Sequence, residues 1–126
     1  MRKEKCLKAQ PKKKQPWYLD SGCSRHMTGD ESLFQELDRK KSGNVSFGEK
    51  SKGIIRGIDT IGNNSHIQIK NVLFVENLKF NLLSISQLCD KGFRVYFEAN
   101  ACHVINSFTN QIIYIGKRHE NVCHSY

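Results

Sequence analysis

Alternation of apolar and polar residues in the middle of the chain is the feature that most constrains the fold. Residues from Val45 to Ile58 alternate in this way on either side of a polar turn, which Gly48 and Gly53 flank. Period-two alternation is typical of a strand with one buried face, so this segment predicts a β-hairpin. His66–Lys70 alternates again, and Val72–Val75 is apolar throughout, as in a strand buried on both faces. The chain is therefore predicted to be mainly β.

A helical pattern is confined to one short stretch near Leu82–Cys89. Its apolar residues recur at spacings of three and four, with Asn81 or Ser84 available to cap the start and Gly92 placed to end it. Short strands are predicted to follow at residues 93–97, 102–106 and 112–115. One short helix among many strands is therefore expected.

Charge is distributed unevenly along the chain. Seven of the 20 lysine and arginine residues lie in residues 1–16 with one of the 12 acidic residues, so most of the formal net charge of +8 belongs to this segment. We expect residues 1–16 to be a basic, flexible linker that could contact RNA phosphates weakly. Residues 17–115 are predicted to form one β-barrel domain. Residues 116–126 have little apolar pattern and are predicted either to fray or to be an extension that leads toward a missing downstream domain.

Two further properties bear on where the protein acts. No segment reaches the roughly 20 apolar residues that span a bilayer, and no apolar segment follows the lysine-rich amino end, so we predict neither membrane contact nor a secretory signal. The five cysteines are odd in number and irregularly spaced, which suits reduced thiols better than a disulfide framework. We therefore expect an intracellular, cytoplasmic protein.

An aspartate stands where the first apolar strand is predicted to end, in the sequence Trp17-Tyr18-Leu19-Asp20-Ser21-Gly22. A carboxylate at the end of a buried strand is costly to desolvate unless it is hydrogen-bonded, paired or used in chemistry. Asp-Ser-Gly after an apolar strand is the form of an aspartic protease active-site loop. An ordinary strand-to-turn junction also accounts for three such common residues.

Three segments together carry a wider resemblance. They are Trp17–Thr28 (WYLDSGCSRHMT), Asn71–Val75 (NVLFV) and Asn81–Leu88 (NLLSISQL). In this order they resemble the retropepsin-like aspartic protease segment of copia-type retrotransposon Gag-Pol polyproteins, also described as the Pol beta-barrel domain. The resemblance covers residues 17–106 and implies a retropepsin-like half-barrel with a flap hairpin and one short helix.

The resemblance implies that Asp20 is the catalytic carboxylate of an aspartic endopeptidase. Peptide hydrolysis by this mechanism needs two carboxylates that share a proton, one to activate a water molecule and one to polarise the substrate carbonyl. The chain supplies one such triplet, because Asp59-Thr60 is followed by Ile61 in place of glycine. A homodimer would bring Asp20 of each subunit together across a two-fold axis. No cofactor is expected.

The remaining roles are also implied by the resemblance. Ser21 would brace the opposing loop of the dimer, and Gly22 would allow close packing beside the dyad. Gly48 and Gly53 would lie near the tip of a flap, Val45 to Ile58, which folds over the carboxylates and grips the substrate. The substrate would be the element's own Gag-Pol polyprotein, cleaved inside cytoplasmic virus-like particles.

Other residues leave alternatives open. Cys23 is expected to pack as a small buried side chain, and His26 to lie on the surface or to brace the loop. Zinc-ligand residue types occur at Cys102-His103, His119 and Cys123-His124, but their spacing matches no standard knuckle or finger, so no metal site is predicted. The chain could also be a catalytically inactive, transposon-derived β-barrel that serves as a binding or dimerisation module.

Overall fold

Short strands paired into one sheet account for most of the fold. The computed structural model describes residues 15–47, 51–62, 68–119 and 122–125. The strands in these residues are β1 (Trp17–Asp20), β2 (His26–Thr28), β3 (Gly43–Phe47), β4 (Ser51–Ile61), β5 (Ile69–Val75), β6 (Asn81–Ser84), β7 (Phe93–Phe97), β8 (Ala101–Asn106), β9 (Ile112–His119) and β10 (Val122–Ser125). A 3-10 turn, η1 (Glu31–Leu33), and an α-helix, α2 (Ile85–Asp90), accompany them.

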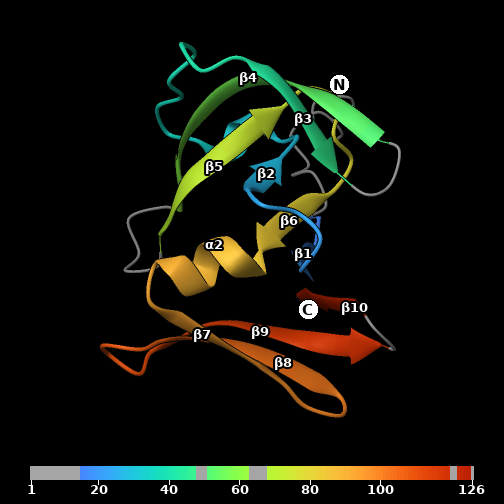
Figure 1. The fold of residues 1–126 in the computed structure, drawn as a ribbon. Helices are drawn as coiled ribbons and strands as arrows, with labels where there is room; N and C mark the ends of the chain where they lie inside the picture. The colour runs from blue at the N-terminus through green and yellow to red at the C-terminus, as the bar shows by residue number, and fades with distance from the viewer. Residues whose placement is uncertain (1–14, 48–50, 63–67, 120–121, 126) are drawn as a thin grey trace, which may run out of the picture.

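The sheet has the strand order β3-β4-β5-β2-β6-β1-β10-β9-β8-β7. In Figure 1, β2 to β5 lie on one side of α2, and the meander of β7, β8 and β9 lies on the other. The prediction of a mainly β, barrel-like domain with one short helix is confirmed for the described residues. β6, β1 and β10 occupy the centre of the sheet and join its two parts.

β1 contributes to the hydrophobic cores of both parts. Successive side chains of a strand point to opposite faces. Leu19 is accordingly buried in a cluster with Leu83 and Leu88, while Tyr18 packs against a separate cluster that contains Met27 and Leu73. The strand that ends in Asp20 is therefore fixed by packing on both faces.

The predicted helix is shorter than expected, because its first turn is a strand. Residues Asn81–Ser84 form β6, all four buried, and α2 begins at Ile85. β6 lies between β1 and β2 and is buried on both faces. Its consecutive apolar residues, Leu82 and Leu83, therefore continue directly into the apolar spacing of α2. From the sequence alone, the strand and the helix look like one helix. Ser84 is the N-cap, as one of the two predicted options, and its hydroxyl accepts from the Gln87 N–H. Gly92 follows the helix with a φ of +91°.

The predicted hairpin is present. β3 and β4 pair antiparallel, with Val45 opposite Gly53. Gly53 lies within β4 rather than at the turn, and a Cβ there would collide with the side chain of Val75. Gly48 lies outside the described residues, as do His66 and Ile67 of a predicted strand. A role of this hairpin as a flap stays a prediction.

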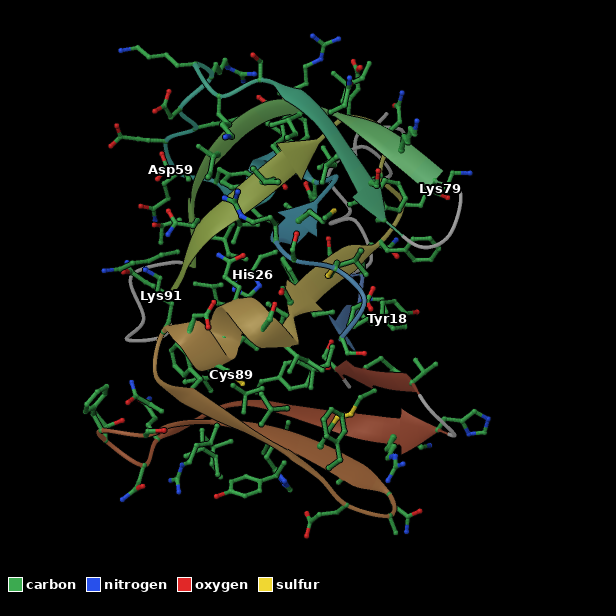
Figure 2. The ribbon with its side chains drawn as sticks, viewed as in Figure 1. Tyr18, His26, Asp59, Lys79, Cys89 and Lys91 are labelled. Carbon is green, nitrogen blue, oxygen red and sulfur yellow. A yellow bond between two sulfur atoms is a disulfide. The ribbon has the colours of Figure 1, made fainter. Side chains whose placement is uncertain are left out.

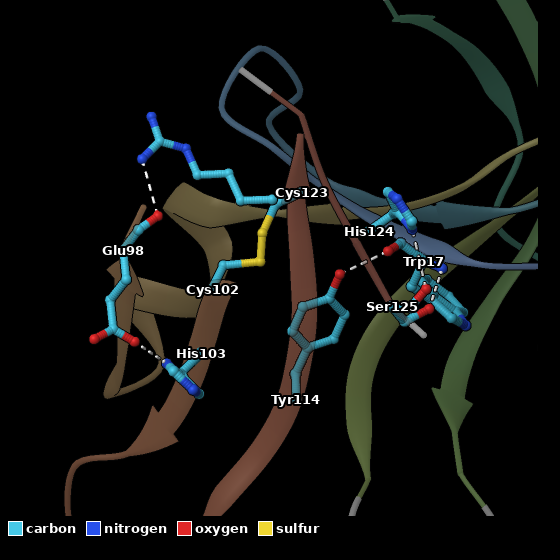
Figure 3. The surroundings of a disulfide bond; sticks show 9 residues. Trp17, Glu98, Cys102, His103, Tyr114, Cys123, His124 and Ser125 are labelled. Atoms are coloured by element: carbon cyan, nitrogen blue, oxygen red, sulfur yellow. Dashed lines mark hydrogen bonds and ion pairs between the residues drawn. A yellow bond between two sulfur atoms is a disulfide. The ribbon is translucent and has the colours of Figure 1, made fainter. Parts of the chain in front are cut away.

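The described residues after Gly116 lie in strands, whereas fraying was one of the two expectations for this segment. β9 continues to His119, and β10 pairs with β9 on one side and with β1 on the other. Side chains of these strands hold the first residue of β1, since the Ser125 hydroxyl accepts from the Trp17 N–H at 2.8 Å and the Tyr114 hydroxyl donates to the Trp17 carbonyl at 2.7 Å. The contacts of Trp17 with Tyr114 and Ser125 are visible in Figure 3. The apolar pattern of residues 116–126 is weak because β10 has only four residues.

The expectation of reduced thiols is wrong for two cysteines. Cys102 of β8 and Cys123 of β10 form a disulfide, with 6.4 Å between their Cα atoms (Figure 3). β9 lies between these strands, and adjacent strands in a sheet are about 4.8 Å apart, so the sheet must curl for the bond to cross it. Gly116 of β9 leaves space for the disulfide, because a Cβ at this position would lie 2.8 Å from the Cys102 sulfur.

The predictions of a basic linker and of no membrane contact concern other parts and properties of the chain. The basic linker predicted for residues 1–16 has its first 14 residues outside the described part of the chain. Among the described residues, no helix has the length and apolar character that crossing a bilayer requires.

The disulfide is expected to stabilise the fold. Its cysteines are 21 residues apart, and closing a loop of that size stabilises a protein by about 3 kcal/mol. Dithiothreitol should therefore lower the urea midpoint of the wild type, and a Cys102→Ala/Cys123→Ala variant should unfold at that lower midpoint with or without reductant. Cys89→Ser, at an exposed free thiol, is the control and should behave like the wild type. An unchanged wild-type midpoint in reductant would contradict the expectation.

Candidate functional site

Asp20 ends β1 at the surface of the protein. The strand runs parallel to β6, which places Asp20 opposite Ser84 in the register. Leu19 is buried, Asp20 is half-buried, and Ser21 and Gly22 are exposed. The Gly22 N–H donates a hydrogen bond of 2.7 Å to Asp20 Oδ1. The turn therefore holds the carboxylate through its own backbone and leaves it accessible at the end of a buried strand.

A buried hydrogen-bond cluster supports the loop that follows Asp20. The Ser84 hydroxyl donates to the Cys23 carbonyl at 2.8 Å, and the Ser84 N–H donates to His26 Nδ1 at 2.9 Å. The His26 N–H in turn donates to Gln87 Oε1 at 2.9 Å. We call these four residues, Cys23, His26, Ser84 and Gln87, the loop brace. It ties the loop after β1 to the junction of β6 and α2.

Ser84 and Gln87 were not singled out as site residues by the sequence reasoning. Both lie in the segment NLLSISQL, one of the three that carried the family resemblance. Ser84 was considered for helix capping alone, although its position opposite Asp20 gives it a second role. That role depends on the parallel pairing of β1 with β6, which local sequence patterns do not show.

His26 braces the loop from a buried position rather than lying on the surface. Its side chain is 2% exposed. Burial lowers the pKa of the imidazole from 6.5 to about 4, and the positive charge of Arg25 adds to this effect. The ring is therefore neutral at pH 7, and because Nδ1 accepts from Ser84, the proton is on Nε2. This arrangement makes His26 a structural acceptor.

Cys23 packs in the core, as predicted. It is buried in the same cluster as Met27 and Leu73. Burial, together with the nearby negative charge of Asp20, raises the pKa of the thiol to about 11. The thiolate needed for redox or nucleophilic chemistry is thus disfavoured. Cys23 therefore has a packing role, and its side chain anchors the loop after Asp20 in the core.

A cavity of about 570 Å³ opens beside the carboxylate. It is lined by Tyr18, Leu19, Asp20, Ser21, Phe80, Leu82, Ile85, Phe97 and Val122. About half of the surface of Phe80, Phe97 and Val122 is exposed, and the Tyr18 and Phe80 rings meet edge to face at 6.0 Å. The volume lies within the range of small-ligand sites. The cavity can hold an apolar side chain next to Asp20.

Among the flap candidates, only Gly53 lies in the described part of the chain, and it is not among the residues that line this cavity. It contacts Val75 on β5 instead. The described part of the hairpin and Asp20 are thus not brought together in the single chain. Gly48 lies outside the described residues.

Three of the zinc-ligand residue types near the C-terminus are engaged in other contacts. Cys102 and Cys123 are bonded to each other, and His103 Nδ1 lies 3.3 Å from a Glu98 carboxylate oxygen. Within residues 15–47, 51–62, 68–119 and 122–125, no group of three or more His, Cys, Asp and Glu side chains could hold a metal ion.

The neutral state of His26 predicts that acid weakens the fold. A histidine whose pKa is lower in the folded state stabilises the fold fully above pH 6.5, and the stabilisation is lost as the pH falls toward 4. The loss amounts to about 3 kcal/mol. Urea unfolding at pH 7.5 and pH 4 measures it. In His26→Asn, where the amide oxygen replaces Nδ1 as acceptor without titrating, the loss of stability should be smaller by that amount. Equal losses in the two proteins would contradict the assignment.

Comparison with known proteins agrees with these features. The family model of the Pol polyprotein beta-barrel domain matches residues 17–93, more than half of the chain. A putative transposon Ty5-1 protein of Saccharomyces cerevisiae is 32% identical over 73 residues, which cover 58% of this chain and 49% of that protein. The chain therefore spans about half the length of this curated relative. No solved structure matches. Because the family model covers β1 to the start of β7, with Asp20 and the whole loop brace, the chain belongs to the Pol polyprotein beta-barrel domain family.

Proposed function

We propose that this chain is an aspartic endopeptidase domain of a retrotransposon polyprotein, active as a homodimer in which the two copies of Asp20 form the catalytic dyad. The observation that carries the proposal is the placement of Asp20. It ends a strand packed on both faces, its loop is fixed by the loop brace, and its carboxylate borders an apolar cavity. A rigid, accessible carboxylate beside a side-chain pocket is what peptide hydrolysis requires.

A second carboxylate must come from another copy of the chain. The sequence contains one Asp-Ser/Thr-Gly triplet, and the near match Asp59-Thr60-Ile61 lies inside β4, where Asp59 pairs with Val72. Ser21 and Gly22 are exposed at the tip of the Asp20 loop, so a second copy can approach them without unfolding. An interface on a two-fold axis would place identical loops against each other.

The two Asp20 carboxylates of the dyad would share one proton. Two carboxylates in contact cannot both be ionised, so one is charged and its partner protonated. The ionised Asp20 takes a proton from a water molecule as the water oxygen attacks the peptide carbonyl carbon. The protonated Asp20 of the partner subunit gives its proton to the carbonyl oxygen. The C–N bond then breaks as the first Asp20 gives the proton that it took from water to the leaving nitrogen, and the hydroxyl formed from the carbonyl oxygen returns its proton to Asp20 of the partner subunit.

Other residues have supporting roles in this proposal. The Gly22 N–H orients the carboxylate by its bond to Oδ1. Ser21 would hold the opposing loop by its hydroxyl. The cavity lined by Tyr18, Phe80 and Phe97 would bind an apolar side chain of the substrate and so align the peptide bond with the dyad. The substrate is proposed to be the polyprotein of the element itself.

Replacement of Asp20 tests the chemistry. Asp20→Asn keeps the size of the side chain and removes the charge, and proton transfer by such a group accounts for about 10²- to 10⁴-fold in rate. We expect cleavage of a polyprotein substrate at mildly acidic pH to fall by at least about 100-fold. Asp59→Asn, the same change in the near-match triplet, is the control and should cleave normally. Undiminished cleavage by Asp20→Asn would remove Asp20 from the mechanism and leave a binding or dimerisation module as the alternative.

Dependence of activity on concentration tests the dimer. If the site is completed by association, cleavage at low protein concentration should rise with the square of that concentration and become linear once the dimer is saturated. Sedimentation of the same samples should show monomers giving way to dimers over the same range. A rate that stays linear where sedimentation finds monomers would contradict a shared site.

A further inference from the structure

A second cavity is lined in part by two residues of the loop brace, His26 and Gln87. Its volume is about 230 Å³, and it lies between the start of β5, helix α2 and the start of β7. His26, Ile69, Leu88 and Phe93 line it with mostly apolar surface. Figure 2 shows His26 between the upper strands and α2. This cavity shares no lining residue with the cavity beside Asp20.

The imidazole of His26, one of the residues that line this cavity, carries a donor that the described part of the chain leaves unused. Nδ1 accepts the Ser84 N–H, so the neutral ring carries its proton on Nε2. No residue in the described part of the chain accepts a hydrogen bond from Nε2, although the side chain is 2% exposed. A buried donor without an acceptor is unfavourable by about 1–3 kcal/mol. A ligand that supplies an acceptor would therefore relieve this penalty.

The charge at this cavity is positive. Lys70 of β5 and Lys91, which follows α2, contribute to its lining and are exposed. No aspartate or glutamate is among the described residues that line it. An unused donor on His26 and two exposed lysines among the lining residues favour an anion with an apolar body. At 230 Å³ the cavity is smaller than typical drug-sized sites, so the body must be small.

We propose that the cavity between β5, α2 and β7 binds a small carboxylate, whose oxygen accepts a hydrogen bond from His26 Nε2 while its apolar body packs on Leu88 and Phe93. Lys70 and Lys91 attract the negative charge. A carboxylate suits the site better than a phosphate, because the cavity is small and Ile69, Leu88 and Phe93 give it a largely apolar lining. This inference does not rest on protease activity, since its residues are separate from Asp20 and it is tested by binding alone.

Titration of the intact chain with phenylacetate tests the proposal. Two-dimensional NMR of the histidine ring nitrogens and backbone amides reports where the acid binds. We expect saturable binding in the millimolar range, with the largest shifts at His26 Nε2 and in α2. Phenylacetamide, which has the same ring without the charge, should bind at least about tenfold more weakly, a difference of about 1.4 kcal/mol. Lys70→Gln/Lys91→Gln should weaken phenylacetate binding by about fivefold or more, and Lys117→Gln, on β9, should not.

His26→Asn isolates the donor. This variant keeps an acceptor for the Ser84 N–H and removes the Nε2 donor, so a folded variant with native amide shifts should lose most of the affinity. The proposal is overturned if no saturable shift appears at His26, which would mean that water alone satisfies Nε2. It is also overturned if phenylacetamide or inorganic phosphate binds as tightly as phenylacetate.

Discussion

The parallel pairing of β1 with β6 is the constraint on which the rest of the structure depends. It runs from Trp17 opposite Asn81 to Asp20 opposite Ser84, and it joins strands that are more than sixty positions apart in the chain. Because the two strands run in the same direction, the loop after β1 and the start of α2 emerge at the same edge of the sheet. Both features of the candidate site, the carboxylate and its support, are therefore placed by one set of backbone hydrogen bonds.

The hydrogen bonds of the loop brace fix the loop after β1 to the junction of β6 and α2. Ser84 caps α2, holds the Cys23 carbonyl and donates to His26, so one residue fixes the loop, the helix and the imidazole together. Burial keeps His26 neutral, which preserves its role as an acceptor at neutral pH. His26 also lines a cavity that is separate from the one beside Asp20. The buried side chain of His26 thus both supports the loop and lines the proposed binding site.

Local patterns in the sequence predicted those parts of the fold that local chemistry decides. Alternation predicted the hairpin of β3 and β4, the apolar run at Val72–Val75 predicted a buried strand, and Gly92 marked the end of the helix. The triplet at Asp20 pointed to the candidate site and to a carboxylate at the end of a strand. These predictions needed information from a few neighbouring residues only.

Long-range pairing accounts for what the sequence did not reveal. Asn81–Ser84 looks helical in isolation and becomes a strand because β1 and β2 flank it. β10 is too short to show a pattern, and its pairing with β1 is decided by burial of Cys123 next to Leu19. The connection of Cys102 to Cys123 could not be deduced from cysteine spacing. Ser84 was missed as a brace for the same reason.

The central claim is that Asp20 becomes competent by meeting its own copy. A crystal structure of the protein grown at mildly acidic pH tests it most directly, through the distance between the Asp20 carboxylate oxygens of neighbouring subunits. The account predicts a two-fold dimer in which these oxygens are about 3 Å apart and share a proton. A monomer, or an assembly that keeps the two carboxylates far apart, would contradict it.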